Sequence, residues 1–137
     1  MKVVLDTNVL VSGLITVHGV CARIVDRMLA EDFQVCVDGR ILAEYASVLA
    51  RPKLAIPFGV RHDVLEFVRY RSARVDPAPL AAALPDATDL PFLEVALEAD
   101  AVLVTGNLRH FPKRSCKRVT VIRPREFLDL LRQSSSA

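Results

Sequence analysis

The feature that most constrains this chain is a short apolar run near its start that ends abruptly on a carboxylate. Val3, Val4 and Leu5 are typical of a strand buried on both faces, as in a parallel sheet, and Asp6 follows directly. A charge at the end of a buried strand is costly to desolvate unless something pairs with it. Because such strand ends open onto the ligand crevice of α/β sheets, Asp6 is predicted either to belong to a site or to hydrogen-bond a local turn.

Strand and helix patterns alternate along the rest of the chain. Apolar runs predict further strands over residues 33–37, 73–75, 100–105 and 119–122. Apolar residues at helical spacing, or a proline in a first turn, predict helices over residues 20–30, 40–50, 60–71, 91–97 and 124–131. Residues 9–14 are too mixed to assign. The alternation predicts an α/β fold in which helices cover both faces of a central parallel sheet.

Length and composition narrow the class of protein. The 137 residues suit one domain, with residues 133–137 expected to fray, and 52% of them are hydrophobic. No apolar run reaches the roughly 18 residues that span a bilayer, and two polar residues interrupt any signal peptide, so a cytoplasmic protein is expected. The three cysteines match neither a disulfide framework nor zinc-ligand spacing. The net charge of +2 is too small to indicate nucleic-acid binding by itself.

Several polar side chains are predicted to meet at the carboxyl edge of the sheet. Asp6 ends the first strand, and Asn107 follows the strand that contains Val102, Leu103 and Val104. Asp86 and Asp89 lie just before a helix, and Glu44 flanks the apolar stripe of another. Ordinary alternatives remain open: Asp86, Asp89 and Asn107 suit turns or helix caps, and Glu44 suits a solvated boundary position.

A fold that gathers these carboxylates must protonate some of them or bind a cation. Two carboxylates about 4 Å apart repel by roughly 4 kcal/mol at an effective dielectric constant of 20. Oxygen ligands suit Mg²⁺ or Mn²⁺. Since no His or Cys is expected near these positions, zinc is disfavoured. Divalent ions held by carboxylates commonly activate water against a phosphodiester.

Four short motifs, in their order and spacing, resemble the PIN-domain nucleases. They are Asp6-Thr7-Asn8, Leu42-Ala43-Glu44-Tyr45, Asp89 followed by Phe92-Leu93-Glu94-Val95-Ala96, and Val104-Thr105-Gly106-Asn107. The similarity covers nearly the whole chain and is greatest to the VapC-like toxins of toxin–antitoxin pairs. It implies a single PIN-like domain over residues 1–137, folded as a three-layer α/β/α sandwich around a parallel sheet, with endoribonuclease activity at an acidic Mg²⁺ or Mn²⁺ site.

The resemblance also implies which residues carry the chemistry. Asp6, Glu44 and Asp89 match the acids of the family and are expected to be catalytic and to hold the metal, while Asn8 and Thr105 assist. The fourth acid of the family is replaced. That position is Asn107, which can offer a carbonyl to a metal but adds no charge, and the nearby Asp86 is a further metal ligand candidate.

The same resemblance implies partners: an RNA substrate, a cognate small antitoxin that offers an Arg to the acids, and a second copy of the chain in a homodimer. Residues 109–125 hold seven Lys or Arg and no acid, and Arg109, Lys113 and Arg114 are the candidates for RNA contact. The alternative is a solvated basic face.

Two other functions remain open. A non-catalytic PIN scaffold that binds RNA or a protein partner is favoured by Asn107 alone. A phosphotransferase of the haloacid-dehalogenase type would need an acid where Asn8 stands. A P-loop is excluded because the chain has no Gly-x₄-Gly-Lys.

Overall fold

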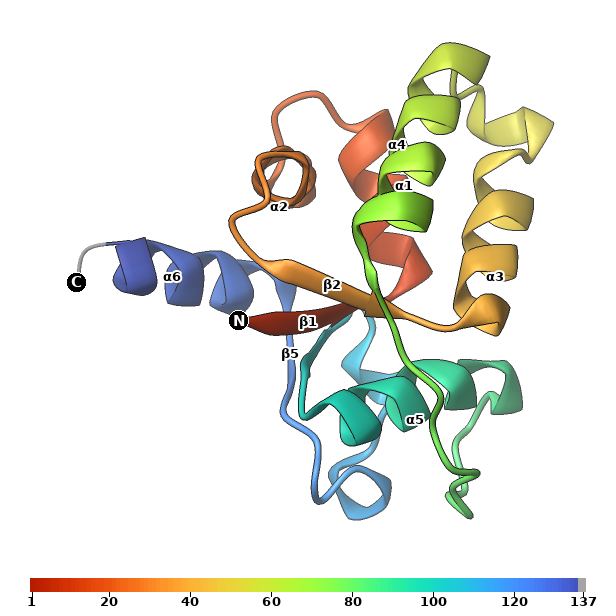
Figure 1. The fold of residues 1–137 in the computed structure, drawn as a ribbon, viewed down its shortest axis with the longest axis vertical. Helices are drawn as coiled ribbons and strands as arrows, with labels where there is room; N and C mark the ends of the chain where they lie inside the picture. Colours follow the sequence, from red (N-terminus) through yellow and green to blue (C-terminus); the bar gives the residue numbers. More distant parts are fainter. Residues whose placement is uncertain (136–137) are drawn as a thin grey trace.

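The chain folds around a five-stranded sheet in which every pairing is parallel (Figure 1). The structure is a computed structural model, and it describes residues 1–135. The strands lie in the order β3-β2-β1-β4-β5. Their bounds are β1 Lys2–Leu5, β2 Gln34–Val37, β3 Ala73–Arg74, β4 Val102–Val104 and β5 Val121–Ile122. The predicted strands all exist, although most are a residue or more shorter than expected.

Strand β1 occupies the centre of the sheet, between β2 and β4. Val3 pairs with Val35 on one side and with Val102 on the other. The chain therefore builds the sheet outward from β1 to β3, returns, and continues on the opposite side with β4 and β5. This change of direction is the topological switch at which α/β sheets open a crevice beyond the carboxyl ends of their strands. Asp6 stands at that point.

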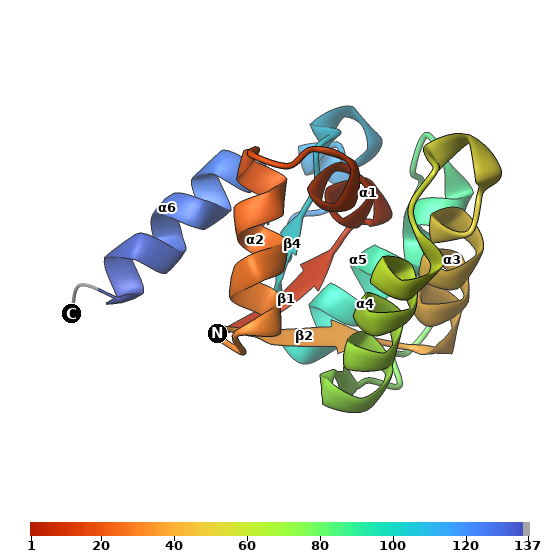
Figure 2. The ribbon, with the colours of Figure 1, turned by 90° about the horizontal axis from the view of Figure 1, so that it is seen from above.

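Helices cover both faces of the sheet, which confirms the three-layer α/β/α prediction. Helix α5 packs under β1, β2 and β4, while α1 and α2 lie on the other side of the strands (Figure 1). Viewed from above, α6 lies beside α2, and α4 lies beside α3 (Figure 2). The bounds are α1 Thr7–Ile15, α2 Val20–Leu29, α3 Gly39–Leu49, α4 Phe58–Arg71, α5 Leu90–Ala99 and α6 Pro124–Ser135.

Helix α1 is the element that the sequence pattern did not assign. It begins directly after Asp6 and packs against α2, and its close approach depends on Gly13. A Cβ atom at Gly13 would lie 2.5 Å from Val25 Cγ2 and 2.8 Å from the Cys21 carbonyl oxygen. The apolar residues of α1 range from the buried Val9 and Leu10 to the exposed Ile15, so its sequence lacks the single stripe that marks an amphipathic helix.

Two further differences lie in connections and at the end of the chain. The connection between α3 and α4, for which no regular structure was predicted, contains a 3₁₀ turn, Pro52–Leu54. Helix α6 continues to Ser135 rather than ending at Leu131, so the predicted frayed tail is helical as far as it is described, and residues 136–137 lie outside the described residues. Within residues 1–135 no single helix is long and apolar enough to cross a membrane; α1 and α2 meet that test only as a pair bent by 102°.

Candidate metal centre

Asp6 is positioned by the two central strands. Its backbone N–H donates to the Val104 carbonyl oxygen at 2.9 Å, which extends the ladder between β1 and β4 by one residue. The side chain is buried and makes no capping hydrogen bond to α1. Instead its Oδ2 accepts a hydrogen bond of 2.8 Å from the hydroxyl of Thr105, which is itself fully buried at the end of β4. The strand end, and not a local turn, determines where this carboxylate points.

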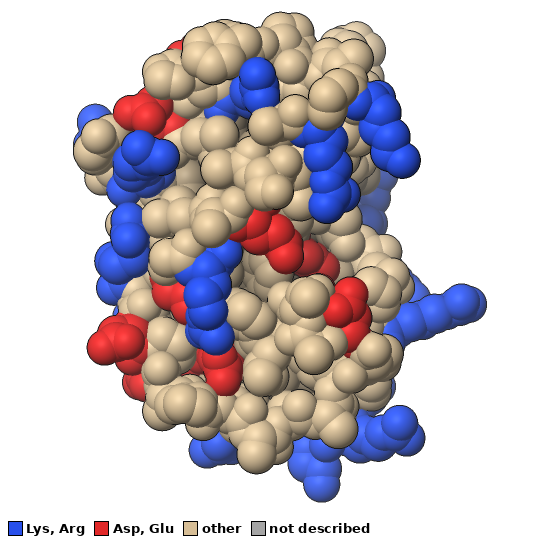
Figure 3. Space-filling view, turned by 90° about the vertical axis from the view of Figure 1, so that its right-hand side faces the viewer, with Lys and Arg blue, Asp and Glu red and all other residues tan. Residues whose placement is uncertain are grey.

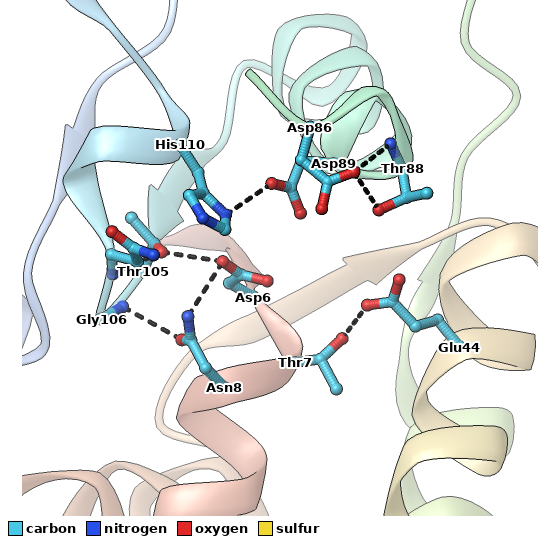
Figure 4. Close-up of polar contacts among 11 residues, drawn as sticks. Asp6, Thr7, Asn8, Glu44, Asp86, Thr88, Asp89, Thr105, Gly106 and His110 are labelled. Carbon is cyan, nitrogen blue, oxygen red and sulfur yellow. Dashed lines mark hydrogen bonds and ion pairs between the residues drawn. The ribbon is translucent and has the colours of Figure 1, made fainter. Parts of the chain in front are cut away.

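Asn8 and Thr105 link the start of α1 to the turn after β4 (Figure 4). The Asn8 amide donates to Asp6 Oδ2 at 3.3 Å, and its Oδ1 accepts from the Gly106 N–H at 3.0 Å. Thr105 Oγ1 accepts from the Asn107 N–H at 3.0 Å while donating to Asp6. Two residues predicted to assist the acids thus hold Asp6 and the turn in one arrangement.

Glu44 approaches from helix α3, and its carboxylate accepts a hydrogen bond from the Thr7 hydroxyl. It is half-buried, at the boundary of the buried face of α3 as predicted. The next residue, Tyr45, is fully buried, and its hydroxyl donates to the Leu5 carbonyl oxygen, directly before Asp6. Burial, followed by the negative charges of Asp6 and Glu44, raises the pKa of Tyr45 well above its ordinary value, so the phenol stays protonated.

Asp86, Asp89 and His110 form a compact group above Asp6 (Figure 4). One ligand atom from each lies within 4.8 Å of the other two. Asp86 Oδ1 accepts from the N–H and the hydroxyl of Thr88, which is the turn role left open as an alternative for Asp86, and its other oxygen remains outside that turn. Asp89 precedes α5 but makes no capping hydrogen bond.

The carboxylate of Asp89 is unusual in being buried with little support. Its relative exposure is 8%, and its Oδ2 has no hydrogen-bond partner. His110 Nδ1 lies 2.8 Å from that oxygen, as an ion pair when the imidazole is protonated, but the ring N–H is not aligned for a hydrogen bond. Burial raises the pKa of Asp89 to about 6, and the charges of Asp6 and Asp86 add to the rise while His110 opposes it.

The other two acids of this edge respond differently to their surroundings. Burial raises the pKa of Asp6, although the hydrogen bonds to its carboxylate and the nearby His110 limit the rise. Asp86 is exposed, and the two hydrogen bonds from Thr88 lower the pKa of its carboxyl below the ordinary value. Negative charge is therefore least tolerated at Asp89.

His110 corrects the sequence analysis, which expected no histidine near the acids and disfavoured zinc on that ground. It lies in the 3₁₀ turn Leu108–His110, three residues after Asn107. That position follows the same strand end as Thr105, so its approach to the carboxyl edge could have been inferred from the turn after β4. Tyr45 was also missed, because it falls within an apolar helical stripe.

The other predicted metal ligands lie near the carboxyl edge of the sheet but do not all belong to one close group of ligand atoms. The side chains of Asp6, Asp86, Asp89 and Glu44 face a common space (Figure 4). Within residues 1–135 the only close group of candidate ligand atoms is the one formed by Asp86, Asp89 and His110. Glu44 and Asp6 lie outside that group, and the Asn107 side chain makes no hydrogen bond within the described part of the chain.

Basic side chains flank the acidic hollow. Acidic atoms occupy a depression across the middle of the face at the carboxyl edge, with Lys and Arg on either side of it (Figure 3). Arg109 and Lys113 are exposed and line an apolar cavity of about 610 Å³ beside β5, together with Phe111 and Cys116. Arg114, also exposed, lines a smaller neighbouring cavity of about 140 Å³. The predicted RNA-contacting residues are therefore available to solvent.

Comparison with known proteins gives the chain its relatives. A model of the PIN domain matches residues 2–109. The chain is 30% identical over 110 residues to the uncharacterized protein MJ1680 of Methanocaldococcus jannaschii, an alignment that covers 78% of this chain and 71% of that protein. Its fold is similar to a crystal structure of VapBC2 from Rickettsia felis bound to a DNA fragment from their promoter, with a TM-score of 0.57 and 18% identity over 90% of this chain and 98% of that chain.

Proposed function

Because this chain belongs to the PIN domain family, we propose that it is a divalent-metal-dependent endoribonuclease that hydrolyses RNA phosphodiesters in the cytoplasm. We further propose that residues 1–137 form a single PIN-like domain. The observation that carries the proposal is the buried Asp89 carboxylate, whose Oδ2 lacks a hydrogen bond and which faces the buried Asp6. Buried carboxylates are ordinarily hydrogen-bonded or bound to a metal ion, and here Asp89 Oδ2 has only the ion pair with His110.

The residues at this edge fit a divalent cation. Asp86 and Asp89 supply carboxylate oxygens close to each other, with Asp6, Glu44 and the amide oxygen of Asn107 as further donors around the same space, and oxygen-rich sets of this kind suit Mg²⁺ or Mn²⁺. When bound there, the ion would activate water and stabilise the leaving oxygen of the phosphodiester.

The protein itself contributes orientation and charge. Thr105 and Asn8 hold the Asp6 carboxylate, and Thr7 holds Glu44, so that these acids face the RNA without reorganisation. Tyr45 fixes the end of β1 through the Leu5 carbonyl. Asp6 and Glu44, oriented by these contacts, are the catalytic acids of the proposal together with Asp89.

The exposed side chains of Arg109, Lys113 and Arg114 would bind the RNA backbone beside the acidic hollow. Phosphate contacts of this kind position a nucleic acid without reading its sequence. Their place on the turns after β4 keeps the bound backbone close to Asp6 and His110.

We also propose that the protein is the toxin of a toxin–antitoxin pair, neutralised by a small cognate antitoxin. The fold is similar to that in a VapBC2 structure, and the acidic hollow suits an Arg side chain that forms bidentate ion pairs with carboxylates. Exposed apolar side chains on α1 and α4, such as Ile15 and Phe58, would serve a homodimer. Sedimentation of the purified protein and growth of cells that express it, with and without the antitoxin, test these partners.

A non-catalytic scaffold that binds RNA or a protein partner is the second candidate, favoured by the loss of charge at Asn107. A haloacid-dehalogenase-type phosphotransferase receives no support, because the Asn8 side chain is engaged with Asp6 and Gly106.

The test is cleavage of end-labelled single-stranded and structured RNA in Mg²⁺, Mn²⁺ or chelator. We expect cleavage with either metal and none in chelator. The Asp89→Asn variant should be inactive, whereas Asp26→Asn, which alters an exposed acid of α2, should cleave normally. Cleavage undiminished by chelator would contradict the proposal, and tight RNA binding without cleavage would support the scaffold.

A further inference from the structure

We propose that His110 is a ligand of this metal centre and gives it a preference for a first-row transition metal, such as Mn²⁺ or Co²⁺, over Mg²⁺. The inference rests on the metal site of the proposed function but not on the identity of the substrate. It assigns to this chain a mixed nitrogen and oxygen donor set in place of an all-oxygen one.

The placement of His110 supports direct ligation. Its imidazole enters the acidic hollow from the turn after β4, on the side opposite Glu44 (Figure 4). Candidate ligand atoms from His110, Asp86 and Asp89 lie within 4.8 Å of one another, close enough for one cation to contact all three. The three side chains come from two separate segments, so the group is produced by the tertiary fold and not by a local turn.

A simple ion pair between His110 and Asp89 explains less of the geometry. The Asp89 side chain is only 11% exposed, and its Oδ2 accepts no aligned hydrogen bond although His110 Nδ1 is only 2.8 Å away. A histidine placed to support this carboxylate would direct its N–H at the oxygen. Two ligand atoms that face a shared cation have no such requirement, because each directs a lone pair at the ion.

Asn107, which replaces the fourth acid of the family, also supports ligation by His110. Asn107 stands where an acid is expected, so the centre has one negative charge fewer, and His110 follows three residues later on the same turn. Mg²⁺ is bound mainly through carboxylates and water, and it gains little from an imidazole. Imidazole nitrogen suits later first-row ions, whose affinity for nitrogen sites rises from Mn²⁺ towards Co²⁺ and beyond. Replacing a negatively charged ligand with a nitrogen donor therefore shifts the preference of the centre from Mg²⁺ towards first-row transition metals.

The test uses His110→Asn, because the amide oxygen of Asn can take the place of Nδ1 at the same distance from the backbone. The variant keeps a neutral donor at this position but replaces the imidazole nitrogen with an amide oxygen. Mn²⁺ and Mg²⁺ affinities are measured by calorimetric titration, and the Mn²⁺ complex is examined by pulsed electron paramagnetic resonance for coupling to ¹⁴N. His18→Asn, at an exposed histidine between α1 and α2, is the matched control.

For the wild type and His18→Asn we expect ¹⁴N coupling and tighter binding of Mn²⁺ than of Mg²⁺. In His110→Asn the coupling should disappear, and the ratio of Mn²⁺ to Mg²⁺ affinity should fall roughly tenfold. Absence of Mn²⁺ binding, absence of ¹⁴N coupling in the wild type, or an unchanged affinity ratio in His110→Asn would each overturn the inference.

The outcome is separable from that of the proposed function. A centre that binds Mn²⁺ through nitrogen but cleaves no RNA would leave the inference standing and contradict the ribonuclease. Cleavage by a centre without nitrogen ligation would do the reverse.

Discussion

The two sides of the candidate centre treat buried negative charge in opposite ways. At the end of β1, Asp6 accepts hydrogen bonds from Thr105 and Asn8, and the strand end beneath it is fixed by Tyr45. At the start of α5, Asp89 is nearly as buried, yet its Oδ2 has no hydrogen bond. Burial, followed by the negative charge of Asp6, raises the pKa of Asp89 to about 6. Hydrogen bonding stabilises a buried carboxylate, whereas one without it is destabilising until a cation arrives.

The contrast indicates a division of roles. The Asp6 side is already organised, and its contacts fix a single direction for the carboxylate. The Asp89 side retains electrostatic strain that a bound cation would relieve. Each variant below either removes this difference between the two sides or enlarges it.

The largest expected effect is on cleavage, where the two sides should behave alike. Asp6→Asn and Asp89→Asn each remove one charged donor, and each should reduce the cleavage rate by more than about 100-fold. The fold should survive both changes, because neither removes buried apolar volume. Rates in saturating Mn²⁺, with circular dichroism as a check on folding, measure this effect; a variant with near-normal cleavage would exclude its acid from the centre.

Removing the hydrogen bond that Thr105 donates to Asp6 should lower the stability of the protein. Thr105→Val deletes the hydroxyl that donates to Asp6, and loss of that hydrogen bond to a buried charge should lower the free energy of unfolding by about 1–3 kcal/mol. Thr120→Val, at an exposed threonine before β5, is the control and should change little. Urea unfolding in chelator gives both values. Equal losses at the two positions would mean that the hydrogen bond to Asp6 contributes nothing specific.

The pH dependence of stability should come mainly from the Asp89 side. The folded pKa of Asp89 is about 6 against an ordinary value of 3.8, so the folded state binds a proton more tightly than the unfolded state. Stability of the metal-free protein should therefore rise as the pH falls from 7 to 5, by on the order of 1 kcal/mol. Asp89→Asn should remove most of that rise. Unfolding in chelator at the two pH values tests it, and an identical rise in the variant would contradict the assignment.

The smallest effect concerns Asn107, at the position of the missing acid. Asn107→Asp adds a charge near Asp6, so the melting temperature without metal should fall by a few degrees. Added Mg²⁺ or Mn²⁺ should more than restore it by binding the folded state. Melting curves against metal concentration provide the measurement. If neither the metal-free stability nor the metal response changes, Asn107 is only a turn residue.

The sequence predicted the position of a candidate site residue correctly where a charged side chain directly follows a strand or helix that is itself predictable. Asp6 follows a buried strand, and the alternation of strands and helices places that end at the carboxyl edge of a parallel sheet. The three-layer fold and the PIN relationship could be predicted for the same reason. Turn positions such as Asp86 could be inferred from residue type alone.

What the sequence did not reveal depends on tertiary contacts. Helix α1 has apolar residues at both buried and exposed positions and contains Gly13, so its pattern carries no periodic signal. His110 lies in an irregular turn, and only the tertiary fold brings its ring to Asp89, 21 positions earlier in the chain. The hydroxyl of Tyr45 is invisible to a hydrophobic pattern, because the ring satisfies the stripe whether or not the oxygen has a partner.

The most direct test of the central claim is a calorimetric titration of Mn²⁺ into the wild type, Asp6→Asn and Asp89→Asn at pH 7. The claim is that these two carboxylates, one supported by hydrogen bonds and one not, hold a common divalent cation. We predict saturable binding to the wild type and at least about tenfold weaker binding to both variants. Binding that is absent from the wild type, or unchanged in Asp89→Asn, would contradict the account.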